Sequence, residues 1–425
     1  MAQFTAEAFQ NQYLSDGATD VHAIVRIDAA GASAMAAPVA GGAAEVIIVD
    51  TSGSMGARGI REGATAAAAA IQEIADGTNF AVIAGNHLAW QVYPKAPVPG
   101  TAVMDARTRS EAMQAVQGFR ADGGTAMGQW LLAARQVFST VPEHYRRHAI
   151  LLTDGANEHE TPDQLTWAIQ SCQGIYQADC RGMGDRWQVD EVRRIASALL
   201  GTVDLIPRPE QMAEEFATLM RASMAKGVAS AELRVWVPQG AQVLFVRQVS
   251  PTLEDLTSRR REVNALTGGY PTGAWSDESR DYHVAVRLPA KSVGQEQLAA
   301  RVQLAIGEEV QAQALVKAMW SNDDALTARI NPQVAQYTGQ AELAAAIQDG
   351  LAAKAAGRDD EATAKLGRAV QLADQAGNTE MTTRLRKVVD IDDAETGTVR
   401  LKKTVEKLDE MALDTASTKT QRVRK

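Results

Sequence analysis

Between residues 45 and 225 the chain alternates short apolar runs with longer segments whose apolar residues recur at helical spacing. The two strongest runs, residues 45–50 (EVIIVD) and 148–153 (HAILLT), are typical of strands buried on both faces. Weaker patterns predict strands at 79–83, 90–93, near Cys180 and at 202–206, and helices at 60–75, 109–119, 127–138, 162–169, 189–200 and 209–225. The alternation predicts a doubly wound, Rossmann-like α/β domain over residues 43–225 with a mostly parallel sheet.

From about residue 226 the pattern changes to alternation with a period of two. Segments of this kind occur at 232–237, 242–249, 282–288, 300–306 and 310–316, separated by Pro, Gly and Ser. They predict a β-sandwich over residues 226–330. A further strand is expected at 21–27 in the N-terminal segment 1–42, before a Gly/Ala-rich stretch, and we expect it to pair with the sandwich. The α/β domain would then be an insertion in the sandwich.

The remaining sequence is first Ala-rich and then charged. Residues 331–390 contain three predicted helices, which fit a small bundle or, more weakly, a tetratricopeptide-like hairpin around residues 357–359. Residues 391–425 are charged and poor in large apolar side chains. We expect them to form a flexible tail.

Composition narrows the class of protein. The chain has 425 residues and a net charge of −9, which argues against a general nucleic-acid binder. No stretch reaches the roughly 18 apolar residues of a spanning helix, and residues 1–20 do not resemble a signal peptide. Two cysteines, Cys172 and Cys180, do not make a disulfide framework, and Cys180 is expected on a core strand. We therefore expect a cytoplasmic protein without membrane contact.

The end of the first buried strand carries the candidate chemistry. Asp50, Ser52 and Ser54 form a D-x-S-x-S motif between a strand and a helix. This spacing places one carboxylate and two hydroxyls on the same side of a tight turn. The other strong strand also ends in a carboxylate, Asp154, and ligands of doubly wound sheets bind beyond these carboxyl ends.

The segment EVIIVDTSGSM resembles the metal-ion-dependent adhesion site of von Willebrand factor A domains. Two further parts of that pattern follow in order, namely the DGGT loop that ends at Thr125 and the LLTDG strand end. The resemblance covers about residues 45–225 and fills all five motif positions, Asp50, Ser52, Ser54, Thr125 and Asp154. It implies a site where the serines and either the threonine or an aspartate bind the metal directly.

Hydroxyl and carboxylate oxygens suit a hard divalent cation, Mg²⁺ or else Mn²⁺ or Ca²⁺. By the resemblance, an Asp or Glu of a protein partner completes the metal shell. Two other interpretations stay open: the aspartates only cap helices, which leaves Thr125 unexplained, or the metal serves stability alone. Family members that switch conformation move the last helix, here about residues 209–225.

Other candidates are weaker. His144 and His148 have the i, i+4 spacing of a zinc pair, but a surface turn is the favoured interpretation. His159 and Glu160 follow Asp154 and either line the rim of the site or, as we favour, are solvated loop residues. The sequence contains no P-loop motif for nucleotide phosphates.

The C-terminal segment repeats the pattern T-x-T-x-R at residues 396–400 and 418–422. Thr398 and Thr420 are candidate phosphorylation sites, and a phosphothreonine there would suit a phosphothreonine-binding domain. A solvated basic tail is the simpler interpretation.

Three functions fit the sequence. The first is a scaffold or adaptor that binds a partner carboxylate through a divalent metal, in a Ser/Thr-phosphorylation system like those that accompany similar actinobacterial proteins. The second is a subunit that works with an AAA+ ATPase of the chelatase or remodelling type. The third, a metal-assisted hydrolase, is disfavoured because no spare acid or base stands beside the motif, so we expect no enzymatic activity.

Overall fold

The computed structural model describes residues 2–35, 42–95, 97–420 and 422. The chain forms two compact units. The first comprises residues 31–229 and 273–276, and the second comprises residues 2–30, 230–272 and 277–425. No helix in the described part of the chain is long and apolar enough to cross a membrane.

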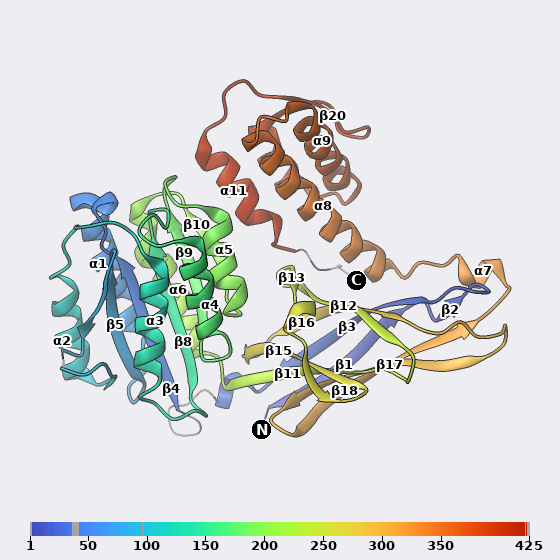
Figure 1. Ribbon diagram of the computed structural model, residues 1–425, viewed down its shortest axis with the longest axis horizontal. Helices are drawn as coiled ribbons and strands as arrows, with labels where there is room; N and C mark the ends of the chain where they lie inside the picture. Colours follow the sequence, from blue (N-terminus) through green and yellow to red (C-terminus); the bar gives the residue numbers. More distant parts are fainter. Residues whose placement is uncertain (1, 36–41, 96, 421, 423–425) are drawn as a thin grey trace. The chain divides into compact units, whose positions relative to one another are not determined.

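The first unit is built on a seven-stranded sheet in the order β10-β9-β8-β4-β5-β6, with β7 also paired to β5 (Figure 1). Strands β10, β9, β8, β4 and β5 are parallel, whereas β6 and β7 are antiparallel to β5. The strands are β4 (Ala43–Asp50), β5 (Asn79–Gly85), β6 (Ala89–Tyr93), β7 (Ala102–Val103), β8 (Arg146–Thr153), β9 (Gln177–Met183) and β10 (Val203–Ile206). The predicted doubly wound α/β fold is confirmed.

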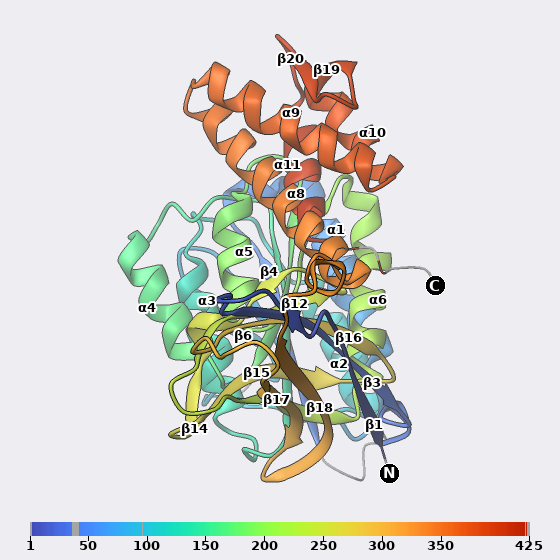
Figure 2. The ribbon, with the colours of Figure 1, turned by 90° about the vertical axis from the view of Figure 1, so that its right-hand side faces the viewer.

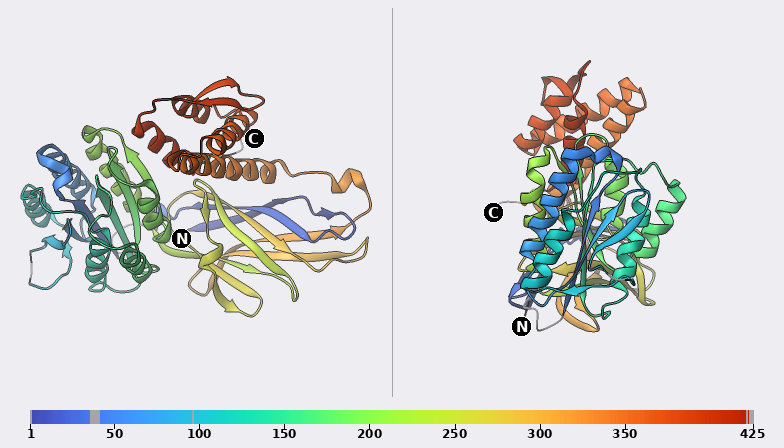
Figure 3. Two further views of the ribbon diagram at one scale, coloured as in Figure 1. Left: turned by 45° about the horizontal axis from the view of Figure 1, so that its top comes forward. Right: turned by 90° about the vertical axis from the view of Figure 1, so that its left-hand side faces the viewer.

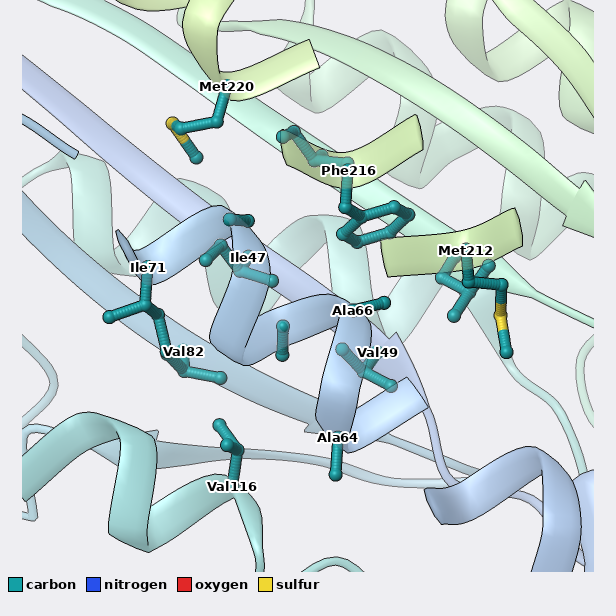
Figure 4. Close-up of a cluster of buried hydrophobic side chains, with 14 of the residues drawn as sticks. Ile47, Val49, Ala64, Ala66, Ile71, Val82, Val116, Met212, Phe216 and Met220 are labelled. Carbon is teal, nitrogen blue, oxygen red and sulfur yellow. The ribbon is translucent and has the colours of Figure 1, made fainter. Parts of the chain in front are cut away.

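Six helices cover the two faces of this sheet (Figure 3). They are α1 (Gly56–Glu73), α2 (Ala106–Val116), α3 (Met127–Phe138), α4 (Pro162–Cys172), α5 (Val189–Ala198) and α6 (Met212–Met224). On one face α1, α2 and α6 pack on the sheet, where Ile71 and Phe216 lie over Ile47 and Val82 (Figure 4). The short alanines of α1 allow α6 to pack closely on α1.

Two sheets form the β-sandwich of the second unit, in the orders β1-β3-β16-β12-β13 and β14-β15-β11-β17-β18-β2. The first sheet has β1 (Gln3–Gln10), β3 (Asp20–Ala30), β12 (Gln242–Ser250), β13 (Glu254–Asp255) and β16 (Ser279–Arg287). The second has β2 (Tyr13–Leu14), β11 (Val228–Trp236), β14 (Arg261–Asn264), β15 (Thr267–Trp275), β17 (Glu296–Ile306) and β18 (Glu309–Trp320). β3 contains the strand expected at 21–27 and pairs with β16 of the same sheet. Along the chain, the α/β domain is inserted between β3 and β11, which belongs to the other sheet.

The C-terminal region corrects the sequence interpretation, because residues 391–417 are folded (Figure 2). Its elements are α7 (Asp324–Thr327), α8 (Pro332–Ala355), α9 (Asp359–Gln375), α10 (Thr379–Val388), β19 (Val389–Asp393), β20 (Thr398–Leu401) and α11 (Lys407–Ser417). Val399 of β20 and Leu413 of α11 are buried in a core shared with α8, α9 and α10. A few well-placed apolar side chains are therefore enough to fold a segment whose composition predicts disorder.

The last described residues are also held in place. The Leu253 amide donates to the Thr418 carbonyl at 2.8 Å, and the Thr420 hydroxyl donates to the Pro251 carbonyl at 3.1 Å. Arg422 lies 3.7 Å from the fully buried carboxylate of Asp281. Thr418, Thr420 and Arg422 of the second T-x-T-x-R copy are thus held by contacts rather than free.

Gly367 of α9 and Gly397 of the β19–β20 turn come into backbone contact, and a Cβ on Gly367 would overlap the Gly397 carbonyl oxygen. We expect Gly367→Ala to lower the free energy of unfolding of this region by about 1–3 kcal/mol, because the helix and the hairpin must separate. Hydrogen exchange at the β20 amides should accelerate in parallel. Gly339→Ala is the control: its Cβ meets open space within α8, so about 0.5–1 kcal/mol of stabilisation is expected. Equal effects of the two variants would contradict the close approach.

A buried polar cluster closes the amino end of the α/β sheet. Glu45 is fully buried. Its Oε1 accepts hydrogen bonds from Arg146 at 2.7 Å and from Ser223 at 2.9 Å. Its Oε2 lies 2.8 Å from His148 Nδ1. The other ring nitrogen of His148 lies 3.0 Å from Asp179. The cluster joins β4, β8 and β9 to the end of α6, which carries Ser223. His148, expected at a surface turn, is instead an internal ion-pair residue with 2% exposure, so that expectation is wrong.

This cluster should give stability a bell-shaped pH dependence. Burial alone would raise the pKa of Glu45, but the positive charges of Arg146 and His148 outweigh burial and lower this pKa. Burial would also raise the pKa of Asp179, but its contact with His148 outweighs burial and lowers this pKa as well. Burial alone would lower the pKa of His148, but the two carboxylates outweigh it and raise this pKa above 6.5. The carboxylates stabilise the fold above their unfolded pKa values, and protonated His148 does so only below its raised pKa.

We therefore expect the contribution of the cluster to be largest between about pH 4.5 and 6.5 and to fall on both sides. The measurement is the urea midpoint against pH for the wild type and for His148→Gln, both in EDTA. In the difference between the two curves, the wild-type advantage should shrink as the pH rises from about 6.5 through the raised pKa of His148. A difference that does not change with pH would show that His148 stays neutral.

Candidate metal centre

The carboxyl ends of two neighbouring parallel strands bring the motif residues together. β4 ends at Asp50 and β8 ends at Thr153, next to Asp154, and the two strands pair in register. The turn after β4 enters a short 3₁₀ helix (Gly53–Met55) and then α1. The DGGT loop joins the site through backbone hydrogen bonds from Gly53 to the Gly123 carbonyl at 2.8 Å and from Asp122 to the Thr51 carbonyl at 2.9 Å.

Three of the predicted side chains form one hydrogen-bonded chain of oxygens. Ser52 Oγ lies 2.8 Å from Ser54 Oγ, and Ser54 Oγ donates to Asp154 Oδ1 at 2.5 Å. These short distances place two hydroxyls and a carboxylate around a common point. Such a set offers only hard oxygen donors, which is the chemistry that Mg²⁺ and Mn²⁺ prefer.

Asp50 lies behind this chain rather than within it. It is fully buried, its Oδ1 accepts from the Ser52 amide at 2.8 Å, and its Oδ2 accepts from the Thr153 hydroxyl at 2.8 Å. Asp50 therefore fixes the turn that presents Ser52 and the strand end that presents Asp154. It does not act merely as a helix cap.

Thr125 reaches the same point from the DGGT loop. A Cβ built on Gly155 would lie 3.0 Å from Thr125 Oγ1 and 3.3 Å from Ser54 Oγ, so these two hydroxyls flank Gly155. Thr125 is itself buried, and its carbonyl accepts from the His159 amide at 2.9 Å. All five predicted residues thus meet at one end of the sheet.

The two carboxylates of this site raise each other's energy when both are charged. Burial raises the pKa of Asp50 above its ordinary value, although hydrogen bonds from Ser52 and Thr153 oppose this. Burial and the charge of Asp50 raise the pKa of Asp154 to about 6, against the hydrogen bond from Ser54 and the charge of Arg186. A cation placed among these oxygens would relieve the repulsion.

A cavity of about 610 Å³ opens above these oxygens. Its lining comprises Ser52, Ser54, His87, Gly123, Gly124, Thr125, Gly155, Ala156, Glu158, His159 and Arg186. His159 lies on the rim, and Glu160 accepts from the Gly128 amide at 2.6 Å at the start of α3. His159 is an exposed loop residue that also lines the rim, so both interpretations hold for it, whereas the half-buried Glu160 does not line the cavity. His87 and Arg186 carry no signal in the sequence, because they come from loops far from the motif.

The weaker candidates do not form a second metal site. Among the described residues, no group of three or more His, Cys, Asp or Glu side chains is placed to hold a metal ion. Cys172 and Cys180 are free, buried thiols, as expected for core positions.

Comparison with known proteins agrees with the fold. A model of the von Willebrand factor type A domain matches residues 44–205, and a model of the von Willebrand factor type A C-terminal domain matches residues 371–417. A von Willebrand factor type A protein from Catenulispora acidiphila has 46% sequence identity and a TM-score of 0.93, covering 99% of this chain and 97% of that one.

Two more distant relatives extend the comparison. The ArnB paralog VWA2 from Sulfolobus acidocaldarius shares the fold over 98% of both chains, with a TM-score of 0.61 and 14% identity. An uncharacterized protein of Synechocystis sp. is 28% identical over 215 residues, and that match spans only 49% of its length.

The fold and the strand-end oxygens define an α/β domain of the von Willebrand factor A class. The chain belongs to the von Willebrand factor type A family. Domains of this family commonly mediate protein–protein interactions, often carry a metal-ion-dependent adhesion site, and are generally not enzymes.

Proposed function

We propose that this protein is a scaffold or adaptor that binds a carboxylate of a protein partner through a divalent cation, Mg²⁺ in the first instance. The observation that carries the proposal is the convergence of Ser52, Ser54 and Asp154 within hydrogen-bond distance, with both serines lining an open cavity. Thr125 flanks the same point, and Asp50 holds the turn from behind.

The residues fit a metal that keeps part of its shell free. Ser52 Oγ, Ser54 Oγ, Thr125 Oγ1 and a carboxylate oxygen of Asp154 would hold the ion, and Asp50 would position Ser52 and Asp154. When bound, the cation supplies a positive centre that an incoming carboxylate can join. Ser52, Ser54 and Thr125 line an open cavity, which would leave room for a partner carboxylate beside the ion.

We expect the protein partner to be retained only while the cation is bound. A direct pull-down tests this, with wild type, Asp50→Ala and Asp154→Ala as baits, each in Mg²⁺ and in EDTA. The proposal requires partners that the wild type retains in Mg²⁺ and that EDTA and both substitutions release. Asp163→Ala, which removes an exposed carboxylate at the start of α4, is the matched control and should behave as the wild type. The same partners in every condition would overturn the proposal.

The proposal includes modification of the two C-terminal threonines, which lie in different surroundings. Thr398 is exposed on β20, and its hydroxyl lies 2.8 Å from that of Thr396. Thr420 is half-buried and would lose its hydrogen bond to Pro251 on phosphorylation. We expect phosphoproteomics to find Thr398 modified in the folded protein and Thr420 modified only where residues 418–422 detach. Absence of phosphate from both would remove this part of the proposal.

A further inference from the structure

Arg186 stands at the mouth of the cavity with an incomplete set of partners. Its Nη1 donates to the Ser54 carbonyl at 3.3 Å, and among the described residues it forms no ion pair. A guanidinium has five N–H donors, so most of those of Arg186 are open to a ligand. Beyond the oxygen cluster, the cavity lining includes one acidic side chain, Glu158, and one guanidinium, Arg186.

The loop that carries Arg186 is held rigidly. The neighbouring Trp187 is fully buried, its indole donates to the Gly184 carbonyl at 3.0 Å, and its ring fills the space that a side chain at Gly182 would need. Gly184 also donates its amide to the Ile206 carbonyl at 3.3 Å. Arg186 is therefore an exposed cation on a well-held loop. The ordered backbone reduces the conformational entropy that is lost when the side chain binds an anion.

Ser54 links this cation to the oxygen cluster. Its hydroxyl belongs to the cluster and its carbonyl accepts from Arg186, so covalent geometry keeps the guanidinium within about 8 Å of Ser54 Oγ. Adjacent residues of a peptide are about 3.8 Å apart at Cα, so the carboxylates of two adjacent acidic residues in a bent peptide can lie about 8 Å apart on one side of the chain.

We propose that the site recognises a partner segment with two neighbouring carboxylates, one for the cation and one for Arg186. This inference rests on the proposed function and adds the chemistry of the partner. Arginine pairs with carboxylates through two parallel hydrogen bonds, which gives the second position its specificity.

Blocked peptides test the proposal on the full chain in Mg²⁺. The probes are Ac-Gly-Asp-Asp-Gly-NH₂ and its mono-acidic counterpart Ac-Gly-Asp-Asn-Gly-NH₂, in which side chains are the only carboxylates. We expect the wild type to bind the di-acidic peptide about tenfold more tightly, which is the effect of one charge-assisted hydrogen-bonded pair. A peptide with two equivalent carboxylates gains only about twofold from having two ways to bind the cation. Arg186→Ala should reduce this preference to about twofold, and calorimetry should show that the variant still takes up Mg²⁺.

Arg194→Ala is the matched control, because it removes an exposed positive charge of the same domain that does not line the cavity. It should keep the tenfold preference. Arg186→Lys should retain part of the preference, since charge remains but the bidentate geometry is lost.

The outcomes separate the two proposals. If the mono-acidic peptide binds only with Mg²⁺ but Arg186→Ala leaves the preference between peptides unchanged, the inference is overturned and the proposed function stands. The inference is also overturned if Arg186→Ala weakens both peptides equally, because the arginine and the cation then hold a single carboxylate. If neither peptide binds the wild type loaded with Mg²⁺, both proposals fail.

Discussion

Replacement of Glu45 by Ala is expected to lower the free energy of unfolding of the α/β domain by about 3–5 kcal/mol. The substitution leaves Arg146 and His148 buried, at 6% and 2% exposure, without the carboxylate that both of them contact. It also removes the acceptor of the Ser223 hydroxyl at the end of α6. Urea denaturation, with fluorescence of the buried Trp130 and Trp187, measures the change.

An exposed ion pair of the same domain provides the comparison. Asp76 is 74% exposed and pairs with Arg109 at 2.6 Å. Asp76→Ala should cost less than about 1 kcal/mol, because solvent screens the pair. If Glu45→Ala costs no more than Asp76→Ala, the buried cluster does not stabilise the domain.

The second large effect concerns the metal centre, where affinity and stability should change in opposite directions. Asp154→Asn removes one of two buried carboxylates and should weaken Mg²⁺ binding by about 10- to 100-fold or more. The metal-free variant should melt at a higher temperature than the metal-free wild type at pH 7.5. The reason is that Asn keeps an acceptor for Ser54 Oγ and ends the repulsion from Asp50.

Calorimetry with Mg²⁺ and thermal melting in EDTA measure the two effects on the same preparations. Asp163→Asn again controls for loss of a surface charge and should change neither quantity. A variant that loses both affinity and metal-free stability would show that Asp154 is a structural residue rather than part of a metal site.

The sequence predicts those site residues that lie close together in the chain or directly after a clear strand. Asp50, Ser52 and Ser54 lie in one turn, and Asp154 follows a strand whose apolar run is unmistakable. Arg186 could not be found in this way, because its position over Ser54 depends on the packing of Trp187 on β9. Its sequence neighbourhood resembles any polar loop.

The fold shows the same division between local and long-range information. The α/β strands are continuous apolar runs, whereas β1 has polar side chains on both faces and β15 contains Pro271 and three glycines. These strands form because other strands, β3 for β1 and β11 for β15, supply their hydrogen-bond partners. The burial of Glu45 could not be predicted either, because a charged residue at the start of an apolar run is normally interpreted as the solvent-exposed end of the strand.

The insertion of the α/β domain sets an order for folding during synthesis. β3 cannot complete its sheet until β16 emerges, since the paired residues Asp20 and Arg287 are 267 positions apart. By then the whole inserted domain has left the ribosome. Once this domain has folded, β3 and β16 are joined through a compact body rather than a long flexible loop, so the entropy cost of bringing them together is smaller. A weakened inserted domain, such as that of Glu45→Ala, should therefore leave the apolar face of β3 exposed for longer. The sandwich would then be the part that aggregates, although the altered residue lies in the other unit.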